Sequence, residues 1–165
     1  MPPVILAVED NMVTGQAIAR EFGKSGFEVH VTESAEDAFA LLEGGLKCDL
    51  MILDFNLPVE QGPEFYRRLG MDPKYAKIPI IPFTSQFESS SATSTSLTSQ
   101  YASSVQADQA GRDRSPIVSK GLSDEVGRIP ASLYVAVAEQ MGRRGIPKPA
   151  LFTQRMREAL DGMQG

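Results

Sequence analysis

The hydrophobic residues in the first half of the chain form short runs with the length and pattern of β-strands. The runs at 4–8, 50–53 and 78–83 are almost continuously apolar, which is typical of parallel strands buried on both faces. The run at 27–31 instead alternates apolar with polar residues, as an edge strand with one solvated face does. We therefore expect four strands in this half, with the alternating one at an edge.

Segments with helical hydrophobic spacing separate these runs. Apolar residues recur at helical intervals in 13–22, 38–42 and 63–69. Ser34, followed three residues later by Asp37, forms a capping-box pattern at the start of the second of these segments. The regular alternation predicts a βαβαβα order, in which parallel strands are joined by right-handed crossovers.

The composition changes sharply after the fourth apolar run. Twelve of the twenty residues at 85–104 are Ser or Thr, so we interpret 85–114 as an irregular segment that cannot offset its ordering entropy by burial. Apolar patterns return in a short strand at 115–119 and in helices at 131–143 and 149–163. The whole pattern predicts an α/β fold: a doubly wound, flavodoxin-like sheet of five parallel strands in the order 2-1-3-4-5, with an additional C-terminal helix.

Length and charge limit the possible functions. The 165 residues suit a single domain over 1–165. The net charge of −5 argues against a nucleic-acid or membrane surface as partner, because either would require a basic face. The single Cys48 excludes an intramolecular disulfide, and no secretory or membrane-spanning segment is evident. We therefore expect a cytoplasmic protein whose partners are proteins, cations or small molecules.

Three acidic residues follow two of the predicted strands. Glu9 and Asp10 come directly after 4–8, and Asp54 comes directly after 50–53. These strands are neighbours in the predicted order, and the carboxyl ends of such strands form the ligand-binding crevice of an open α/β sheet. Taken alone, Asp10 could be a helix N-cap and Asp54 a turn residue. Together they favour a cation site, because three clustered carboxylates repel one another and their oxygens suit hard Mg²⁺.

The residues at the strand ends resemble those of a known family, the CheY-like receiver domain of two-component response regulators. The first 85 residues agree with this family in the order, spacing and strand position of the motifs. The matching stretches are Val8-Glu9-Asp10-Asn11, then Leu53-Asp54-Phe55-Asn56-Leu57-Pro58 followed by Gly62, then Ile80-Ile81-Pro82-Phe83-Thr84-Ser85.

The resemblance implies a role for each matching residue. Asp54 would be the phosphoacceptor, attacking a phosphoryl group as a carboxylate nucleophile. Glu9 and Asp10 would hold Mg²⁺ together with Asp54 and the backbone carbonyl of Asn56. Thr84 would supply the hydroxyl that bonds a phosphoryl oxygen. Pro58 and Gly62 would be structural, with the glycine permitting the backbone bend before the third helix.

The family also carries a lysine at the end of the fifth strand, and two residues here are candidates. Lys120 follows the strand-like run at 115–119, whereas Lys148 is followed by proline, as family lysines commonly are. We favour Lys120 because the end of a strand places the ammonium group over the site. Two departures from the family pattern are the lack of an aromatic residue on the fifth strand and Pro82, which removes a backbone donor from a central strand.

The resemblance predicts a stand-alone receiver that accepts phosphate from a sensor histidine kinase or phosphotransfer protein. It would then signal by contact with a downstream protein, without binding nucleic acid or membrane. The alternative is a phosphorylation-independent pseudo-receiver that acts only as an interaction module. An enzyme is not expected, because aspartyl phosphatases need a second acid two residues after the nucleophile, and this chain has Asn56 there.

Overall fold

The strands form one parallel sheet. The computed structural model describes residues 2–84, 117–119 and 129–164. Within these residues the strands lie in the order β2-β1-β3-β4-β5, and all pairs are parallel. The strands are β1 (Val4–Val8), β2 (Glu28–Thr32), β3 (Leu50–Leu53), β4 (Ile80–Thr84) and β5 (Val118–Ser119). The predicted order of the first four strands is confirmed, with the alternating strand at the edge.

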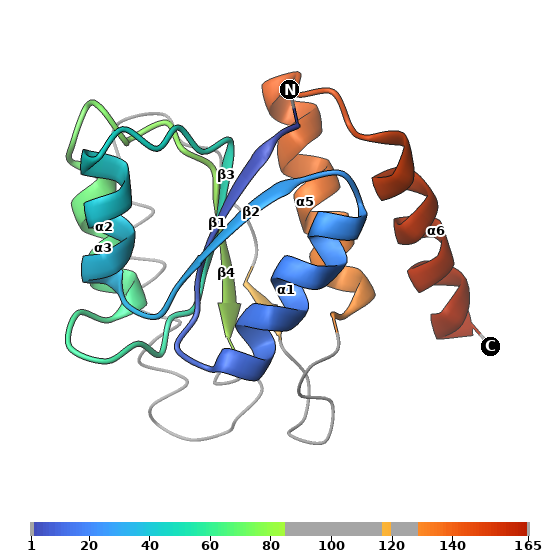
Figure 1. Ribbon diagram of the computed structural model, residues 1–165, viewed down its shortest axis with the longest axis horizontal. Helices are drawn as coiled ribbons and strands as arrows, with labels where there is room; N and C mark the ends of the chain where they lie inside the picture. The colour runs from blue at the N-terminus through green and yellow to red at the C-terminus, as the bar shows by residue number, and fades with distance from the viewer. Residues whose placement is uncertain (1, 85–116, 120–128, 165) are drawn as a thin grey trace.

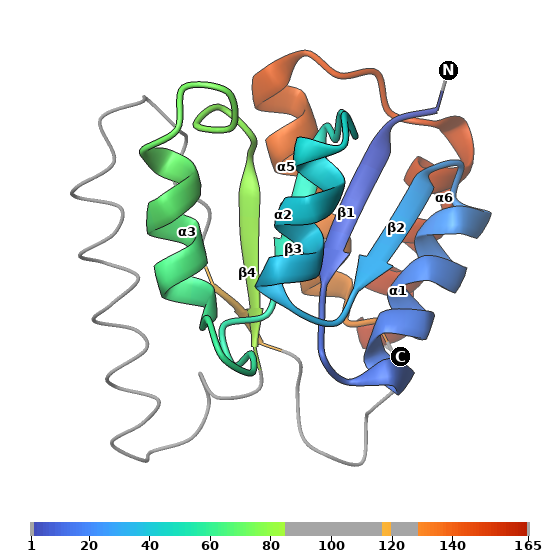
Figure 2. The same ribbon diagram turned by 60° about the vertical axis from the view of Figure 1, so that its left-hand side comes forward.

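Helices cover both faces of the sheet (Figure 1). Helices α2 and α3 lie on one face, and α1 and α5 lie on the other (Figure 2). The additional helix α6 packs against α1 and α5, outside this second layer. The bounds are α1 (Met12–Lys24), α2 (Ala35–Glu43), α3 (Gly62–Gly70), α5 (Ala131–Arg144) and α6 (Ala150–Gln164). Among the described residues, no helix combines the length and apolarity needed to cross a membrane.

The alternation of side chains along β1 and β3 creates two hydrophobic cores. Successive residues of a strand point to opposite faces, so a strand covered by helices on both sides must be apolar throughout. Ile5 and Ile52 lie in the core beneath α1 and α5, whereas Leu6 and Leu53 lie in the core beneath α2 and α3. The four side chains are at most 1% exposed. The continuously apolar runs therefore reflect burial on both faces.

An aromatic cluster attaches α6 to the rest of the molecule. Phe152, near the start of this helix, is fully buried and contacts the ring of Phe27 edge-on at 5.1 Å between centroids. It also lies near the rings of Phe22 and Tyr134, which stack on each other at 5.1 Å. At the surface, Arg155 donates to the carboxylate of Glu21 on α1. The predicted extra helix at 149–163 is confirmed, and these contacts explain why it folds back onto the sheet.

The region after β4 is described only in part. The predicted irregular segment at 85–114 lies outside the described residues, as do the first two positions of the strand predicted at 115–119. The described pairing between β4 and β5 joins Phe83 to Val118 and Thr84 to Ser119, so it begins directly after Pro82. Pro82 itself lies opposite Leu53 of β3. Pro82 thus lies in a strand with neighbours on both sides, directly before the described β4–β5 pairs.

Candidate functional site

Two backbone hydrogen bonds bring the acidic residues together at the carboxyl ends of β1 and β3. The N–H of Asp54 donates to the carbonyl of Val8 at 2.9 Å, and the N–H of Glu9 donates to the carbonyl of Thr32 at 2.9 Å. Carboxylate oxygens of Glu9, Asp10 and Asp54 consequently lie within 4.8 Å of one another. Glu9 and Asp54 are each 2% exposed, whereas Asp10 is open to solvent. The predicted convergence of three carboxylates is confirmed.

Asn11 takes the capping role that was the simpler alternative for Asp10. The side-chain oxygen of Asn11 accepts hydrogen bonds from the N–H groups of Val13 and Thr14, at 3.0 and 3.2 Å, and so caps α1. The N–H of Asn11 in turn donates to Oε1 of Glu9 at 3.2 Å. The helix cap thus orients the Glu9 carboxylate and leaves the Asp10 carboxylate to face the cluster.

The loop after β3 orients Asp54 from the other side. The N–H of Asn56 donates to Oδ1 of Asp54 at 3.0 Å, and the N–H of Gly62 donates to the carbonyl of Phe55 at 3.2 Å. A Cβ on Gly62 would lie 2.5 Å from Cα of Phe55 and 2.6 Å from the carbonyl oxygen of Asp54. The φ of Gly62 is not positive. The backbone bend expected for this glycine stays a prediction, and the structure adds a second reason: the start of α3 lies against the loop backbone with no room for a Cβ.

The donor set of the cluster suits a hard divalent cation. All three side chains offer carboxylate oxygens, and the exposed Asp10 leaves room for water on one side. Two of the carboxylates are almost fully buried, so a cation among them would offset both their mutual repulsion and their lost hydration. Glu9, Asp10 and Asp54 could hold such an ion.

The other predicted site residues are placed less completely. The backbone of Thr84 ends β4, beside the carboxyl end of β3. Lys120 lies outside the described residues, directly after the last residue of β5. Lys148 lies between α5 and α6, where its neighbour Pro149 contacts Gly26 in the connection before β2. That connection is at the amino edge of the sheet, so Lys148 is at the end opposite the acidic cluster.

An ion pair between the loop after Asp54 and α3 was not anticipated from the sequence. Glu60, in the loop after Asp54, accepts two hydrogen bonds from the guanidinium of Arg68 on α3, at 3.0 and 2.8 Å. The spacing of eight residues from a loop into a helix has no simple sequence signature. Only the direction of α3 relative to the loop shows that the two side chains meet.

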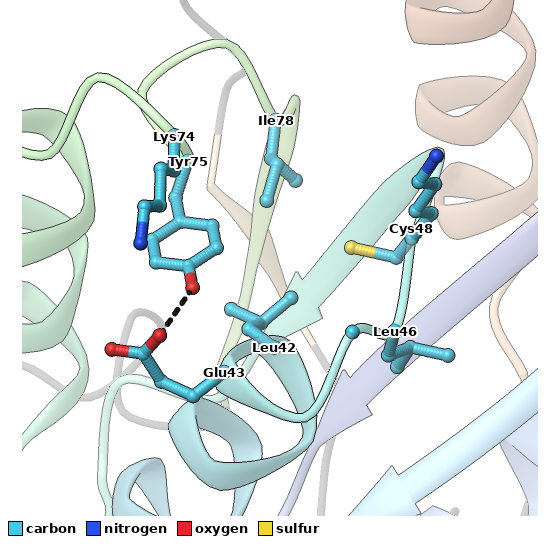
Figure 3. Close-up of a pocket in the computed structure, with 9 residues that line it drawn as sticks. Leu42, Glu43, Leu46, Cys48, Lys74, Tyr75 and Ile78 are labelled. Atoms are coloured by element: carbon cyan, nitrogen blue, oxygen red, sulfur yellow. Dashed lines mark hydrogen bonds between the residues drawn. The ribbon is translucent and has the colours of Figure 1, made fainter.

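A separate cavity lies at the amino edge of the sheet. Figure 3 shows its lining between the α2–β3 and α3–β4 connections, with the thiol of Cys48 directed into it. Its volume is 390 Å³, and on one side the hydroxyl of Tyr75 donates to Glu43 at 3.0 Å. Burial, together with the nearby Asp49 carboxylate, raises the pKa of the Cys48 thiol to about 12. The cavity is at the opposite edge of the sheet from the acidic cluster. The raised pKa keeps its thiol protonated.

The chain is similar to response regulators in sequence and in structure. It is 36% identical over 90 residues to the phosphate regulon transcriptional regulatory protein PhoB of Rhizobium meliloti, covering 54% of this chain and 39% of that protein. It is 31% identical over 85 residues to the two-component response regulator ORR11 of Oryza sativa, covering 52% and 58%. The chain thus spans about half, or less, of the length of these curated relatives.

A solved structure and a family model agree with these relatives. The Mn²⁺-bound form of response regulator Rcp1 superposes with a TM-score of 0.59 over 90% of this chain and all of that chain, at 20% identity, which shows a shared fold. The model of the response regulator receiver domain matches residues 5–102. This match covers more than half of the chain and includes all three clustered carboxylates. The chain belongs to the response regulator receiver domain family.

Proposed function

We propose that this receiver domain accepts a phosphoryl group on the Asp54 carboxylate, from a sensor histidine kinase or a phosphotransfer protein, in a step that requires Mg²⁺. The observation that carries the proposal is the cluster of Glu9, Asp10 and Asp54 within 4.8 Å at the carboxyl edge of the sheet. Membership in the family supports phosphoryl acceptance in two-component signalling. The relative Rcp1 in its Mn²⁺-bound form supports a divalent cation.

Each residue would have a defined part in the transfer. One oxygen of Asp54 attacks phosphorus while the bond from phosphorus to the donor nitrogen breaks and its electron pair returns to that nitrogen. The N–H of Asn56 donates to Oδ1 of Asp54 and so fixes the orientation of the attacking carboxylate. Glu9, Asp10, Asp54 and the carbonyl of Asn56 would hold Mg²⁺, which supplies charge neutralisation as two anions approach. Thr84 and Lys120 would contact the phosphoryl oxygens.

We propose that the domain signals by contact with another protein and does not act as an enzyme that releases a product. Asn56 occupies the position where an aspartyl phosphatase carries its second acid, so the chain offers no side chain there to protonate a leaving group. The phosphorylated domain itself would therefore be the signal. The downstream target would then be a protein that binds this state.

The direct test is labelling of the full chain with Mg²⁺ and acetyl phosphate, followed by mass spectrometry of peptides. Label on the peptide that contains Asp54 is expected, and Asp54→Asn should abolish it. Asp161→Asn, an exposed carboxylate on α6, is the matched control and should be labelled like the wild type. A wild type that takes no label while still binding Mg²⁺ would instead support the phosphorylation-independent interaction module.

A further inference from the structure

The loop between β3 and α3 contains a residue in an unfavourable backbone conformation. Val59 has φ of 60°, in the left-handed region, and its side chain is 91% exposed. This conformation is unfavourable for an L-residue because Cβ comes too close to the following carbonyl oxygen, and a β-branched residue is especially rare there. Because the exposed side chain packs on little, contacts made by neighbouring residues must hold the loop in place.

The next residue provides such a contact. Glu60 forms a bidentate ion pair with Arg68: Nε to Oε2 is 3.0 Å and Nη2 to Oε1 is 2.8 Å. The side chains are 19% and 40% exposed, so the pair is partly shielded from solvent. Two parallel hydrogen bonds fix the direction of a carboxylate as well as its distance. The pair therefore ties the Glu60 end of the loop to α3.

Arg68 is itself held by aromatic rings. Its guanidinium carbon lies 4.2 Å from the ring centroid of Phe39 on α2 and 5.2 Å from that of Phe65 on α3. Stacking of this kind restricts a long side chain to one orientation. The rings of the helix layer thus define the place of the guanidinium, and the guanidinium defines the place of Glu60.

We infer that Arg68 is a positioning residue for the phosphoacceptor loop, an inference that rests on the proposed function. The loop that it holds carries Asn56, whose N–H orients Asp54 and whose carbonyl would face the metal. With the ion pair broken, Val59 can relax from the left-handed region and the loop loses its fixed path. Asn56 then no longer holds a fixed position beside Asp54, so metal binding and phosphorylation both weaken.

The test compares Arg68→Lys with Arg67→Lys. Lysine keeps the charge but loses both the two-pronged geometry and the stacking, and Arg67 is an exposed residue of the same helix turn. Arg68→Lys should raise the Mg²⁺ dissociation constant about tenfold in calorimetry and slow labelling by acetyl phosphate at saturating Mg²⁺. Arg67→Lys should leave both within twofold of wild type.

A double variant separates positioning from a general loss of structure. Asparagine tolerates the left-handed region, so Val59→Asn should restore most of the Mg²⁺ affinity lost in Arg68→Lys. A purely structural contribution of Arg68 would not be rescued at position 59. Absence of rescue, or equal effects of the Arg67 and Arg68 variants, would overturn the inference.

Failure of the proposed function would show differently. If wild type neither binds Mg²⁺ nor takes label, amide hydrogen exchange at Asn56 and Glu60 still reports on the loop. Exchange at these positions should be faster in Arg68→Lys than in Arg67→Lys. Equal exchange in the two variants would overturn the positioning role whatever the activity of the wild type.

Discussion

The N–H of Asp54 lies 2.9 Å from the carbonyl oxygen of Val8 and donates a hydrogen bond to it. This bond extends the β1–β3 ladder by one residue beyond the end of β3, so the residue after β1 and the residue after β3 are held side by side. Glu9 and Asp54 meet for this reason, although 45 positions separate them along the chain. The position of the site is thus a consequence of strand register, and changes that disturb the register or the adjoining loop should disturb the site.

Gly62→Ala is expected to destabilise the folded protein strongly, although Gly62 lies at the boundary between a loop and α3. The new Cβ would lie 2.5 Å from Cα of Phe55, which is backbone and cannot turn aside. Forcing such a displacement should lower the free energy of unfolding by about 1–3 kcal/mol in urea denaturation. Gly23→Ala is the matched control, because it lies in α1 with no atom within 4 Å of the new Cβ. It should be stabilising by about 0.5–1 kcal/mol, and a loss of stability there would contradict this explanation.

Phe152→Ala should release α6 from the α1–α5 layer. The fully buried ring contacts three other aromatic rings, so its removal should cost about 3–5 kcal/mol in the free energy of unfolding. The neighbouring Leu151 is 55% exposed, and Leu151→Ala should change stability by less than about 0.5 kcal/mol. Denaturant unfolding of both variants checks the difference. Similar small effects would mean that α6 contributes little to the core.

The Cys48 thiol should make the free energy of unfolding fall as pH rises into the alkaline range. Its pKa is raised from 9.0 to about 12, so the folded state favours the protonated thiol. This contribution is complete below pH 9 and is lost as pH rises from about 9 to 12, with a limiting slope of about 1.4 kcal/mol per pH unit. The free energy of unfolding should therefore fall more steeply for wild type than for Cys48→Ala over this range. Parallel curves for the two proteins would contradict the assignment.

Acid should weaken the contact between α1 and α6. Burial opposes ionisation of the Glu21 carboxyl, but hydrogen bonds from Arg155 and Arg20 outweigh it and lower the pKa of Glu21 below its ordinary value of 4.5. A lowered pKa stabilises the folded protein above the unfolded value, and this stability is lost as pH falls through the folded pKa. Arg155→Met should cost about 1 kcal/mol at pH 7, and the difference from wild type should shrink toward pH 3.

The control for this prediction is Arg157→Met, an exposed arginine on the same helix. Its difference from wild type should be small and should not change with pH. A loss in Arg155→Met that is the same at pH 7 and pH 3 would mean that its stem packs on the protein and that the charge contributes little.

The sequence alone was sufficient for the first four strands, the helices between them and the three acidic residues. Burial on both faces makes β1 and β3 continuously apolar, so an acid directly after either run stands out in the sequence. The chemistry therefore appears in the sequence as acids directly after apolar runs. Val4–Val8 and Leu50–Leu53 agree with their predicted bounds for this reason.

Tertiary structure alone decided the features that depend on the relative placement of distant elements. The reason for Gly62 is the approach of α3 to the loop backbone, and the Glu60–Arg68 pair depends on the direction in which α3 leaves that loop. Likewise, only packing shows that Lys148 lies at the opposite edge from Asp54. Local patterns report whether a residue is buried or capped, because those properties repeat along one element. Contacts between different elements produce no periodic pattern in the sequence, so only the folded structure shows them.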